Sequence, residues 1–231
     1  MVIPTPPLPT VAILHSDKRF PVHRIYCVGR NYADHISEMG GQPKNTLPVF
    51  FMKPADAVVD DGGAIPYPPE TNNLHYEGEL VIAIGKEGRH IELDEAINHV
   101  FGYAVGIDLT RRDLQKAAKE KGGPWDAAKG FDHSAPLSAI RQLDEGGPVN
   151  AGRLCLKVND DIRQDADLEQ MIWSVPQIIS VLSNFYTLLP GDLIFTGTPS
   201  GVGPVLPGDT ITVGIENVGT LKTHIVSGAD L

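Results

Sequence analysis

HYEGELVIAIG, residues 75–85, joins two chemically different segments. Its second part, ELVIAIG at 79–85, is an apolar run typical of a buried strand. Its first part places two carboxylates, Glu77 and Glu79, at the mouth of that strand. Residues i and i+2 of a strand point to the same face, so we expect the two acids to lie side by side. Like charges at that distance repel, and burying them unpaired costs free energy, so their presence requires an explanation.

Other strands and helices are predicted on both sides of this segment. The strands are VFFMKP (49–54), AVVDD (57–61) and GYAVGID (102–108), and a short helix is predicted at 94–101. A second helix is predicted in RRDLQKAAKEK, with Thr110 as its N-cap and Gly122 and Gly123 at its end.

A third helix is capped by Ser174 and carries an apolar stripe that we expect in the core: Val175, Ile178, Ile179, Leu182, Phe185 and Tyr186. A short repeat follows it, LPGDLIFTG at 189–197 and LPGDTITVG at 206–214. Each copy predicts a type II turn at Pro-Gly that leads into a strand. The balance of elements predicts an α+β, β-rich fold, with an irregular lead-in at 1–20 and a single catalytic domain at 21–231.

The composition of the chain argues against nucleic-acid binding and against a membrane location. The 231 residues include 19 Lys and Arg against 29 Asp and Glu, a formal net charge of −10. Nucleic-acid binding needs a basic face, so nucleic acid is not expected as a partner. No stretch predicts a signal peptide or a membrane span, and the two distant cysteines are expected to be free thiols. We therefore expect a cytoplasmic protein that does not act at a membrane.

A metal cation explains the paired acids, because it converts their repulsion into chelation. Hard divalent ions such as Mg²⁺ take oxygen ligands and keep open positions for water or substrate. Asp108, at the end of the strand at 102–108, offers a third carboxylate. For an isolated E-x-E pattern, however, two solvent-facing glutamates on an edge strand are the commoner explanation.

NYADHISEM, residues 31–39, suggests a catalytic base. His35 and Glu38 are three apart, so on one helical turn they share a face and can hydrogen-bond. A carboxylate on one imidazole nitrogen fixes the tautomer and raises the basicity of the other nitrogen, as a water-activating base requires. The alternative is an ordinary surface His–Glu pair.

Two further stretches carry polar groups that could reach the same site. Arg112 and Gln115 are three apart on the helix that follows Asp108, and Lys129 lies in a Gly-bounded loop. TGTPSGVGP at 196–204 lacks the lysine of a P-loop, so a nucleotide site is not expected there, although a backbone-lined ligand loop is possible.

Taken together, GRNYADHISEM, FFMKP, HYEGEL, GYAVGIDLTRRDLQ, PWDAAKGFD and TGTPSGVG resemble the fumarylacetoacetate hydrolase family, in the same order, over residues 29–203. They are most similar to its short, single-domain branch of acylpyruvases and fumarylpyruvate hydrolases. The resemblance implies a mixed β-sheet roll with a few short helices, a homodimer, and a Mg²⁺ or Mn²⁺ site.

The resemblance also implies roles for individual residues. Glu77, Glu79 and Asp108 match the metal ligands of the family, His35 and Glu38 its water-activating pair, and Lys129 its active-site lysine. Four residues match positions that approach substrate: Arg112, Gln115, Lys53 and Thr198. Tyr76 departs from the family pattern, in which a second histidine is common, but it points to the opposite strand face from the glutamates.

The resulting hypothesis is a metal-dependent hydrolase that cleaves a C–C bond in a fumarylpyruvate-like acylpyruvate, giving fumarate and pyruvate. The first alternative is oxaloacetate decarboxylation, or isomerisation of a hydroxymuconate-type diacid, because both use the same metal and enolate. The second alternative is a non-catalytic protein that binds an oxo acid, for which a missing catalytic group is expected. His35, Glu38 and Lys129 are all present.

Overall fold

The strand that begins between the paired acids lies in the middle of the largest sheet. The computed structural model describes residues 3–4, 6–38, 47–60 and 62–228. The largest sheet has the order β4–β3–β15–β8–β9–β11–β5, with β12 paired to β9. Its strands are β3 (Arg24–Val28), β4 (Phe50–Lys53), β5 (Val58–Asp60), β8 (Gly78–Ile84), β9 (Val100–Ile107), β11 (Ala135–Leu137), β12 (Arg141–Gln142) and β15 (Asp192–Phe195).

Three smaller sheets accompany it. A five-stranded sheet has the order β14–β13–β17–β18–β6, a three-stranded one β10–β7–β16, and a hairpin joins β1 and β2. Their bounds are β1 (Thr10–Ala12), β2 (Arg19–Pro21), β6 (Ala64–Pro66), β7 (Leu74–Tyr76), β10 (Thr110–Arg111), β13 (Arg153–Val158), β14 (Asp161–Asp167), β16 (Gly203–Pro204), β17 (Thr210–Ile215) and β18 (Gly219–Val226). The five-stranded sheet packs against β8 and β9, and the main core lies between the two.

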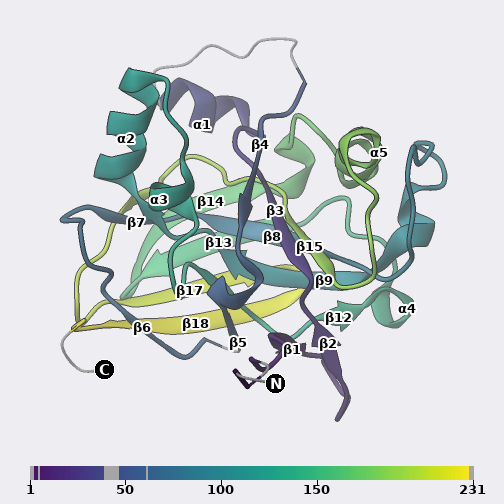
Figure 1. The fold of residues 1–231 in the computed structure, drawn as a ribbon, viewed down its shortest axis with the longest axis horizontal. Coiled ribbons are helices and arrows are strands. Elements are labelled where there is room, and N and C mark those ends of the chain that lie inside the picture. Colours follow the sequence, from purple (N-terminus) through teal and green to yellow (C-terminus); the bar gives the residue numbers. More distant parts are fainter. Residues whose placement is uncertain (1–2, 5, 39–46, 61, 229–231) are drawn as a thin grey trace.

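The helices are short and lie around the sheets. They are α1 (Ala33–Glu38), α2 (Arg112–Lys121), α3 (Asp126–Lys129), α4 (Leu143–Gly146) and α5 (Val175–Phe185), with 3₁₀ turns η1 (Ala55–Ala57), η2 (Ala96–His99) and η3 (Leu168–Gln170). Figure 1 shows α1, α2 and α3 gathered on one side of the molecule, with β1 and β2 on the opposite side. None of the helices in the described ranges is long and apolar enough to span a membrane. The predicted α+β, β-rich roll of mixed sheets is confirmed.

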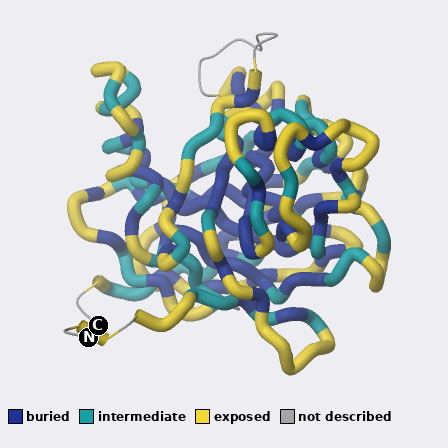
Figure 2. The backbone as a smooth tube through the Cα atoms, turned by 45° about the vertical axis from the view of Figure 1, so that its right-hand side comes forward, coloured by how far each residue is buried: buried dark blue, intermediate teal, exposed yellow. Residues whose placement is uncertain are grey.

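The strand β8 is covered on both faces, which explains its nearly continuous apolar sequence. Leu80, Ile82 and Ile84 pack into the core between the two larger sheets. Val81 and Ala83 point the other way, into a second core beside β3, β11 and β15. Figure 2 shows this interior as a continuous buried zone beneath an exposed surface.

The pairing of β8 with β9 determines where the acids lie. Gly78 pairs with Ile107, and the next residues outward, Glu77 and Asp108, lie directly opposite each other, with the Asp108 N–H donating to the Glu77 carbonyl at 2.8 Å. Glu79 lies on the same face of β8 as Glu77, because side chains alternate along a strand. Tyr76 packs into the core on the opposite face, as predicted.

The lead-in was expected to be irregular over residues 1–20, and this is wrong for its second half. Thr10–Ala12 and Arg19–Pro21 pair as an antiparallel hairpin. Val11 and Phe20 are buried in the second core, so the hairpin is stabilised by contacts remote in sequence. The remaining division into a lead-in and one catalytic domain stays a prediction.

Two helix predictions next to β9 and β10 also need correction. Of the helix predicted at 94–101, only the 3₁₀ turn η2 forms, because Val100 and Phe101 are part of β9, and Val100 pairs with Ile84 of β8. Thr110 is not an N-cap. It pairs with His75 in a sheet, and its hydroxyl accepts a hydrogen bond from Lys129, so Arg111 takes the N-cap position of α2.

Other local predictions are confirmed. Gly122 ends α2 in the left-handed conformation, with φ of 64°, and Ser174 is the N-cap of α5. Four members of the apolar stripe are buried, but Phe185 and Tyr186, where α5 ends, are 58% and 38% exposed and do not belong to the core.

Both copies of the LPGD repeat form the predicted turn. Gly191 and Gly208 have φ of 97° and 98°, values that a type II turn requires at this position. The aspartate that follows each glycine donates its N–H to the preceding leucine carbonyl at 3.0 Å, and a strand begins at or just after it.

One buried side chain ties the five-stranded sheet to the start of β8. Gln164 of β14 is fully buried. Its Oε1 accepts from the Gly78 N–H at 2.9 Å, and its Nε2 donates to the Thr198 hydroxyl at 2.8 Å and to the Pro199 carbonyl at 2.9 Å. A Cβ on Gly78 would lie only 3.0 Å from Leu156, so the two sheets approach closely between the two acids.

Replacing Gln164 with methionine should destabilise the protein. The variant fills a similar volume but leaves the Gly78 N–H and the Pro199 carbonyl without their buried partner. A loss of about 1–3 kcal/mol in the free energy of unfolding is expected for each unsatisfied group, measured by urea denaturation. Arg163→Met is the matched control on the same strand, since Arg163 makes only an exposed ion pair with Asp161 and should change stability by less than about 1 kcal/mol. Equal stability of the two variants would contradict the role of Gln164.

Candidate functional site

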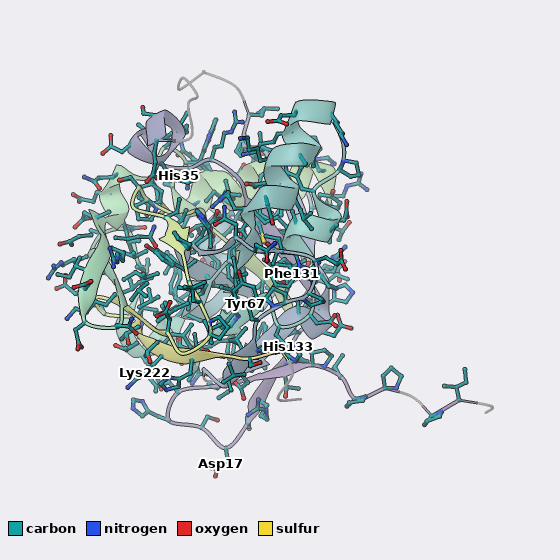
Figure 3. All side chains as sticks on the ribbon, turned by 90° about the vertical axis from the view of Figure 1, so that its left-hand side faces the viewer. Asp17, His35, Tyr67, Phe131, His133 and Lys222 are labelled. Atoms are coloured by element: carbon teal, nitrogen blue, oxygen red, sulfur yellow. The ribbon has the colours of Figure 1, made fainter. Side chains whose placement is uncertain are left out.

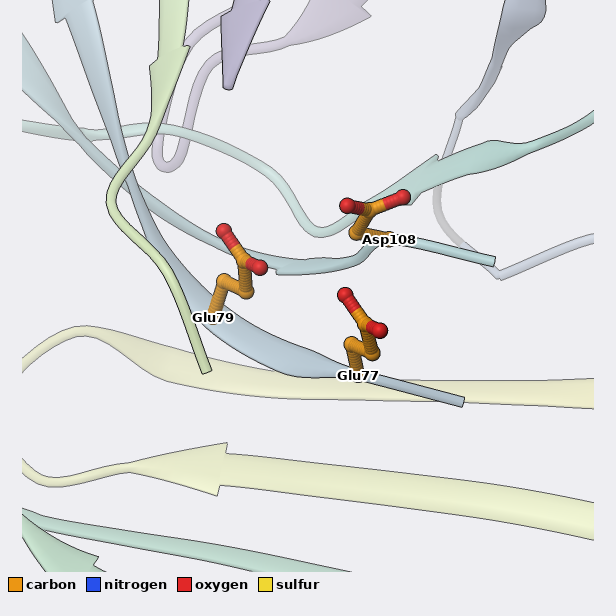
Figure 4. A group of neighbouring side chains, drawn as sticks. All are labelled: Glu77, Glu79 and Asp108. Atoms are coloured by element: carbon orange, nitrogen blue, oxygen red, sulfur yellow. The ribbon is translucent and has the colours of Figure 1, made fainter. Parts of the chain in front are cut away.

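Three buried carboxylates meet where β8 and β9 pair. Glu77, Glu79 and Asp108 each offer an oxygen atom, and these atoms all lie within 4.8 Å of one another. Figure 4 shows Glu77 and Glu79 close together along the chain where β8 begins, with Asp108 beside them. All three residues are at most 5% exposed, so the explanation of two solvent-facing glutamates is excluded.

Two of the three acids are neutralised by cations. The Lys129 ammonium donates to Glu77 Oε2 at 2.8 Å, to Asp108 Oδ2 at 2.7 Å and to the Thr110 hydroxyl at 2.6 Å. Arg112 also donates to Glu77. Burial alone would raise the pKa of Glu77, but Lys129 and Arg112 hold it well below its usual range. Burial would likewise lower the pKa of Lys129, and Asp108 and Glu77 raise it instead.

Glu79 is the exception. No described cation lies within ion-pair distance of it, and its carboxylate accepts a hydrogen bond from the Gly197 N–H at 2.8 Å. Burial raises the pKa of Glu79 well above its usual range, and the charges of Asp108 and Glu77 add to this effect. The cluster is therefore short of positive charge beside Glu79.

A divalent metal fits this arrangement. Mg²⁺ binds oxygen at 2.0–2.1 Å, so two ligands on opposite sides of one ion are about 4.2 Å apart, a spacing similar to that of the three carboxylates. The ion would also supply the missing positive charge next to Glu79. The Glu77, Glu79 and Asp108 cluster can therefore bind a divalent metal ion.

The predicted pair of His35 and Glu38 forms on α1. His35 Nδ1 lies 3.2 Å from Glu38 Oε2, and the Gly201 N–H donates to Glu38 Oε1 at 3.1 Å. Figure 3 shows His35 beneath α1, at the end of the molecule opposite Asp17. The net effect on basicity differs from the expectation: burial lowers the pKa of His35 below 6.5, and this outweighs the raising effect of Glu77 and Glu38. The imidazole is therefore neutral at pH 7.

One cavity joins some of these groups, but Glu38, Glu79 and Asp108 are not among the described residues that line it. Its walls include five of the predicted site residues: His35, Glu77, Arg112, Gln115 and Lys129. Within this part of the site, Arg112 donates to Gln115 Oε1 at 2.6 Å.

Lys53 and Thr198, predicted to approach substrate, are not among the described residues that line the cavity. Lys53 Nζ lies 2.8 Å from Asp108 Oδ1 and donates to the Leu109 carbonyl at 3.1 Å. The Thr198 hydroxyl donates to the Gly78 carbonyl at 2.9 Å. The structure thus gives both side chains partners within the protein, behind the acids.

Several residues of the site had not been singled out from the sequence. His75 accepts from Arg112 Nε at 3.4 Å, and its position two residues before Glu77 on the same strand face was a usable signal. Lys119 lines the cavity together with Arg112 and Gln115, and the i, i+3, i+7 spacing of the three along one helix face was a second signal.

Two other residues gave no comparable signal. Gln164 lies in β14, far along the chain from the segments that carry the acids and His35, and no sequence pattern marks it. Asn31 is fully buried and donates through its side chain to the carbonyls of Trp173 at 3.0 Å and Thr196 at 2.8 Å. These partners are remote in sequence.

Comparisons with known proteins identify the family of this chain. A family profile described as "Fumarylacetoacetate (FAA) hydrolase C-terminal" matches residues 24–226. The chain is 44% identical over 201 residues (87% of this chain, 90% of the relative) to oxaloacetate tautomerase FAHD1, mitochondrial, of Mus musculus. It is also 44% identical over 176 residues (76% of this chain, 91% of the relative) to fumarylpyruvate hydrolase of Ralstonia sp.

A solved structure is similar over almost its whole length. The crystal structure of fumarylpyruvate hydrolase from Pseudomonas aeruginosa in complex with Mn²⁺ and pyruvate has a TM-score of 0.95 and 46% sequence identity to this chain. The match covers 98% of this chain and 99% of that one.

The unequal pairing of the acids predicts different consequences for two substitutions. Glu79→Gln replaces a buried acid whose charged form has no cation partner and is disfavoured, so the metal-free protein should lose no stability. Glu77→Gln leaves Lys129 and Arg112 short of a counter-charge and should lower the free energy of unfolding by about 3–5 kcal/mol. Both variants should lose Mn²⁺ binding, and Ala at either position or at Asp108 should abolish activity.

Urea denaturation in EDTA measures the stability, and electron paramagnetic resonance of free Mn²⁺ measures the binding. Wild-type Mn²⁺ affinity in any of these variants would show that the altered acid is not a ligand.

Proposed function

The chain belongs to the fumarylacetoacetate hydrolase family and is a hydrolase acting on carbon–carbon bonds; we propose that its substrate is a fumarylpyruvate-like acylpyruvate, which it cleaves to fumarate and pyruvate. The observation that carries this proposal is a cavity lined both by Glu77, one member of the buried acid cluster, and by His35, which Glu38 orients.

Glu77, Glu79 and Asp108 would hold the metal, for which we propose Mg²⁺ or Mn²⁺. When bound, the ion supplies a Lewis acid that polarises the oxygen atoms of the 2-oxo acid and stabilises negative charge on the departing pyruvate. Counted over the whole cluster, the three acids equal the three cations Lys53, Lys129 and Arg112 in number, although none of these cations pairs with Glu79. A divalent ion would therefore leave the cluster with a surplus of positive charge, which suits an anionic oxo acid.

His35 is the group positioned to act on water. With Nδ1 donating to Glu38, the lone pair is on Nε2, and a neutral imidazole can accept a proton there. Water that loses this proton adds to the distal carbonyl carbon of the acylpyruvate. The bond from that carbon to the methylene then breaks, and its electron pair leaves with pyruvate as an enolate, which takes up a proton.

The remaining predicted residues act around this step. Lys129 stabilises negative charge next to the cluster, as proposed from the sequence, and it also holds Glu77 and Asp108 together. Arg112 and Gln115 line the cavity and are proposed to contact the substrate. Lys53 and Thr198 support the acids from behind.

Reactions of oxaloacetate are the second candidate, and one observation favours them. The mouse relative named oxaloacetate tautomerase is as similar in sequence as the Ralstonia fumarylpyruvate hydrolase. Tautomerisation needs a base but no water nucleophile, and decarboxylation or isomerisation of a hydroxymuconate-type diacid needs no activated water either. A panel of acylpyruvates with oxaloacetate, assayed with Mg²⁺ and with products identified, distinguishes these reactions.

We further propose a homodimer located in the cytoplasm. Cys27 and Cys155 are both free thiols in the structure, which is compatible with a reducing compartment.

Replacing His35 with alanine should separate hydrolysis from decarboxylation in one protein. Hydrolysis should fall by roughly 10²–10⁴, the usual contribution of a general base. Oxaloacetate decarboxylation should survive better, because it needs the enolate stabilised but no water activated. Both activities are measured at saturating Mg²⁺, with His15→Ala as an exposed control and Mn²⁺ binding confirmed. Equal loss of both activities, or full hydrolysis, would contradict the proposed role of His35.

The pH profile tests the His35–Glu38 pair. Because burial holds the pKa of His35 below 6.5, kcat/KM for hydrolysis should be constant through pH 7 and fall only at lower pH, where the imidazole gains a proton. Glu38 stabilises the protonated form, so Glu38→Gln should move this acid limb to still lower pH while reducing the maximal rate. A limb that moves to higher pH, or does not move, would show that Glu38 does not act on His35.

A further inference from the structure

The cavity has a closed end and an open end with different charge properties. At the closed end, Glu77 and Lys129 are 5% and 2% exposed. Toward the open end, the lining continues with half-buried Lys119 on α2, half-buried Trp125, and exposed Arg30, two residues after the end of β3. The lining therefore includes cations in addition to the groups assigned to the 2-oxo acid and to water.

The cations at the closed end are paired, whereas those at the open end are not. Arg112 and Lys129 are bonded to carboxylates of the cluster. Neither Arg30 nor Lys119 has a carboxylate within ion-pair distance in the ranges that the structure describes. The contact that the structure gives Lys119 is with the Trp125 ring, whose centroid lies 5.1 Å from the ammonium.

Lys119 differs from an ordinary solvated lysine. Burial, together with the positive charges of Arg112, Arg30 and Lys129, lowers the pKa of Lys119 to about 8, against the raising effect of Glu77. Cations from α2, from α3 and from the segment after β3 thus lie around Lys119, and no described carboxylate pairs with Lys119 itself. An anion held at this point would relieve their mutual repulsion, as the acids do at the closed end.

Aromatic rings connect the two ends. Phe51 lies beside Lys129, with 5.0 Å from the ammonium to the ring centroid, and its ring centroid is 5.9 Å from that of Trp125. Trp125 in turn contacts Lys119. A flat, apolar chain that runs along these rings would start at the acid cluster and finish at Lys119.

We propose that Arg30 and Lys119 form a receptor for a second carboxylate at the far end of the substrate. This inference rests on the proposed function and narrows its substrate class to 2,4-dioxo acids whose acyl chain ends in a carboxylate rather than an alkyl group. Lys119 and Arg30 are then specificity-determining residues, and the Phe51 and Trp125 rings cover the chain between the two anionic ends.

The kinetic test compares two substrates that differ at one end only. Fumarylpyruvate ends in a carboxylate, and crotonylpyruvate has a methyl group in its place. The wild-type enzyme should prefer fumarylpyruvate, and Lys119→Met or Arg30→Met should each reduce the ratio of the two kcat/KM values about 10- to 100-fold, as expected for losing a hydrogen bond to a charged group. The loss should come from a higher KM for fumarylpyruvate. Lys116→Met, an exposed lysine on the same helix, is the control and should leave the ratio unchanged.

A binding test separates this inference from the proposed reaction. 2-Oxoheptanedioate and 2-oxoheptanoate have the same seven-carbon length and differ by the terminal carboxylate, and neither has the 4-oxo group needed for cleavage. In calorimetric titrations of the Mn²⁺-loaded protein, the diacid should bind about 10- to 100-fold more tightly, and Lys119→Met should remove that difference. If the wild-type protein bound the two acids with equal affinity, the proposed carboxylate receptor would be wrong. It would also be wrong if Lys119→Met and Arg30→Met both kept the preference for the diacid. A diacid preference in an enzyme that hydrolyses no acylpyruvate would instead reject the proposed reaction and leave the subsite standing.

Discussion

Mutual repulsion among three buried carboxylates is the constraint on which the site depends. Glu77, Glu79 and Asp108 lie close together away from water, where uncompensated charges are costly. Lys129 and Arg112 neutralise part of this charge and are fixed in place by doing so. Glu79 remains without a cation, and that local deficit is why the cluster can bind a divalent metal ion instead of serving only as an ion-pair network.

The backbone around the cluster is arranged to maintain that proximity. Pairing of β8 with β9 puts Asp108 opposite Glu77, and alternation along β8 adds Glu79 to the same face. Between the two glutamates, Gly78 allows close approach of the second sheet, and Gln164 from that sheet satisfies the Gly78 N–H. The same residues therefore join the two sheets and position the acids, so stability and function depend on one set of contacts.

Charge changes along the cavity in a way that suits a substrate with two anionic ends. The closed end combines acids and paired cations and can take up a metal, and neutral His35 lies beside it. The open end presents cations that no described acid neutralises. Two relatives with different named activities are each 44% identical to this chain, and one fold can host several activities, so overall similarity does not by itself identify the substrate.

Much of the closed end was predictable from the sequence, because its signals are local. Two-residue spacing on a strand, three-residue spacing on a helix and an apolar run flanked by acids identified Glu77, Glu79, His35 and Glu38. The Pro-Gly turns and the cap at Ser174 likewise depend on adjacent residues. Only the tertiary structure decided which cations neutralise which acids and that burial makes His35 less basic rather than more. It also decided that Lys53 and Thr198 have partners within the protein and that Thr10–Pro21 forms a hairpin. These features depend on contacts between residues far apart in sequence and on the removal of water, and neither is encoded in the spacing of neighbouring residues.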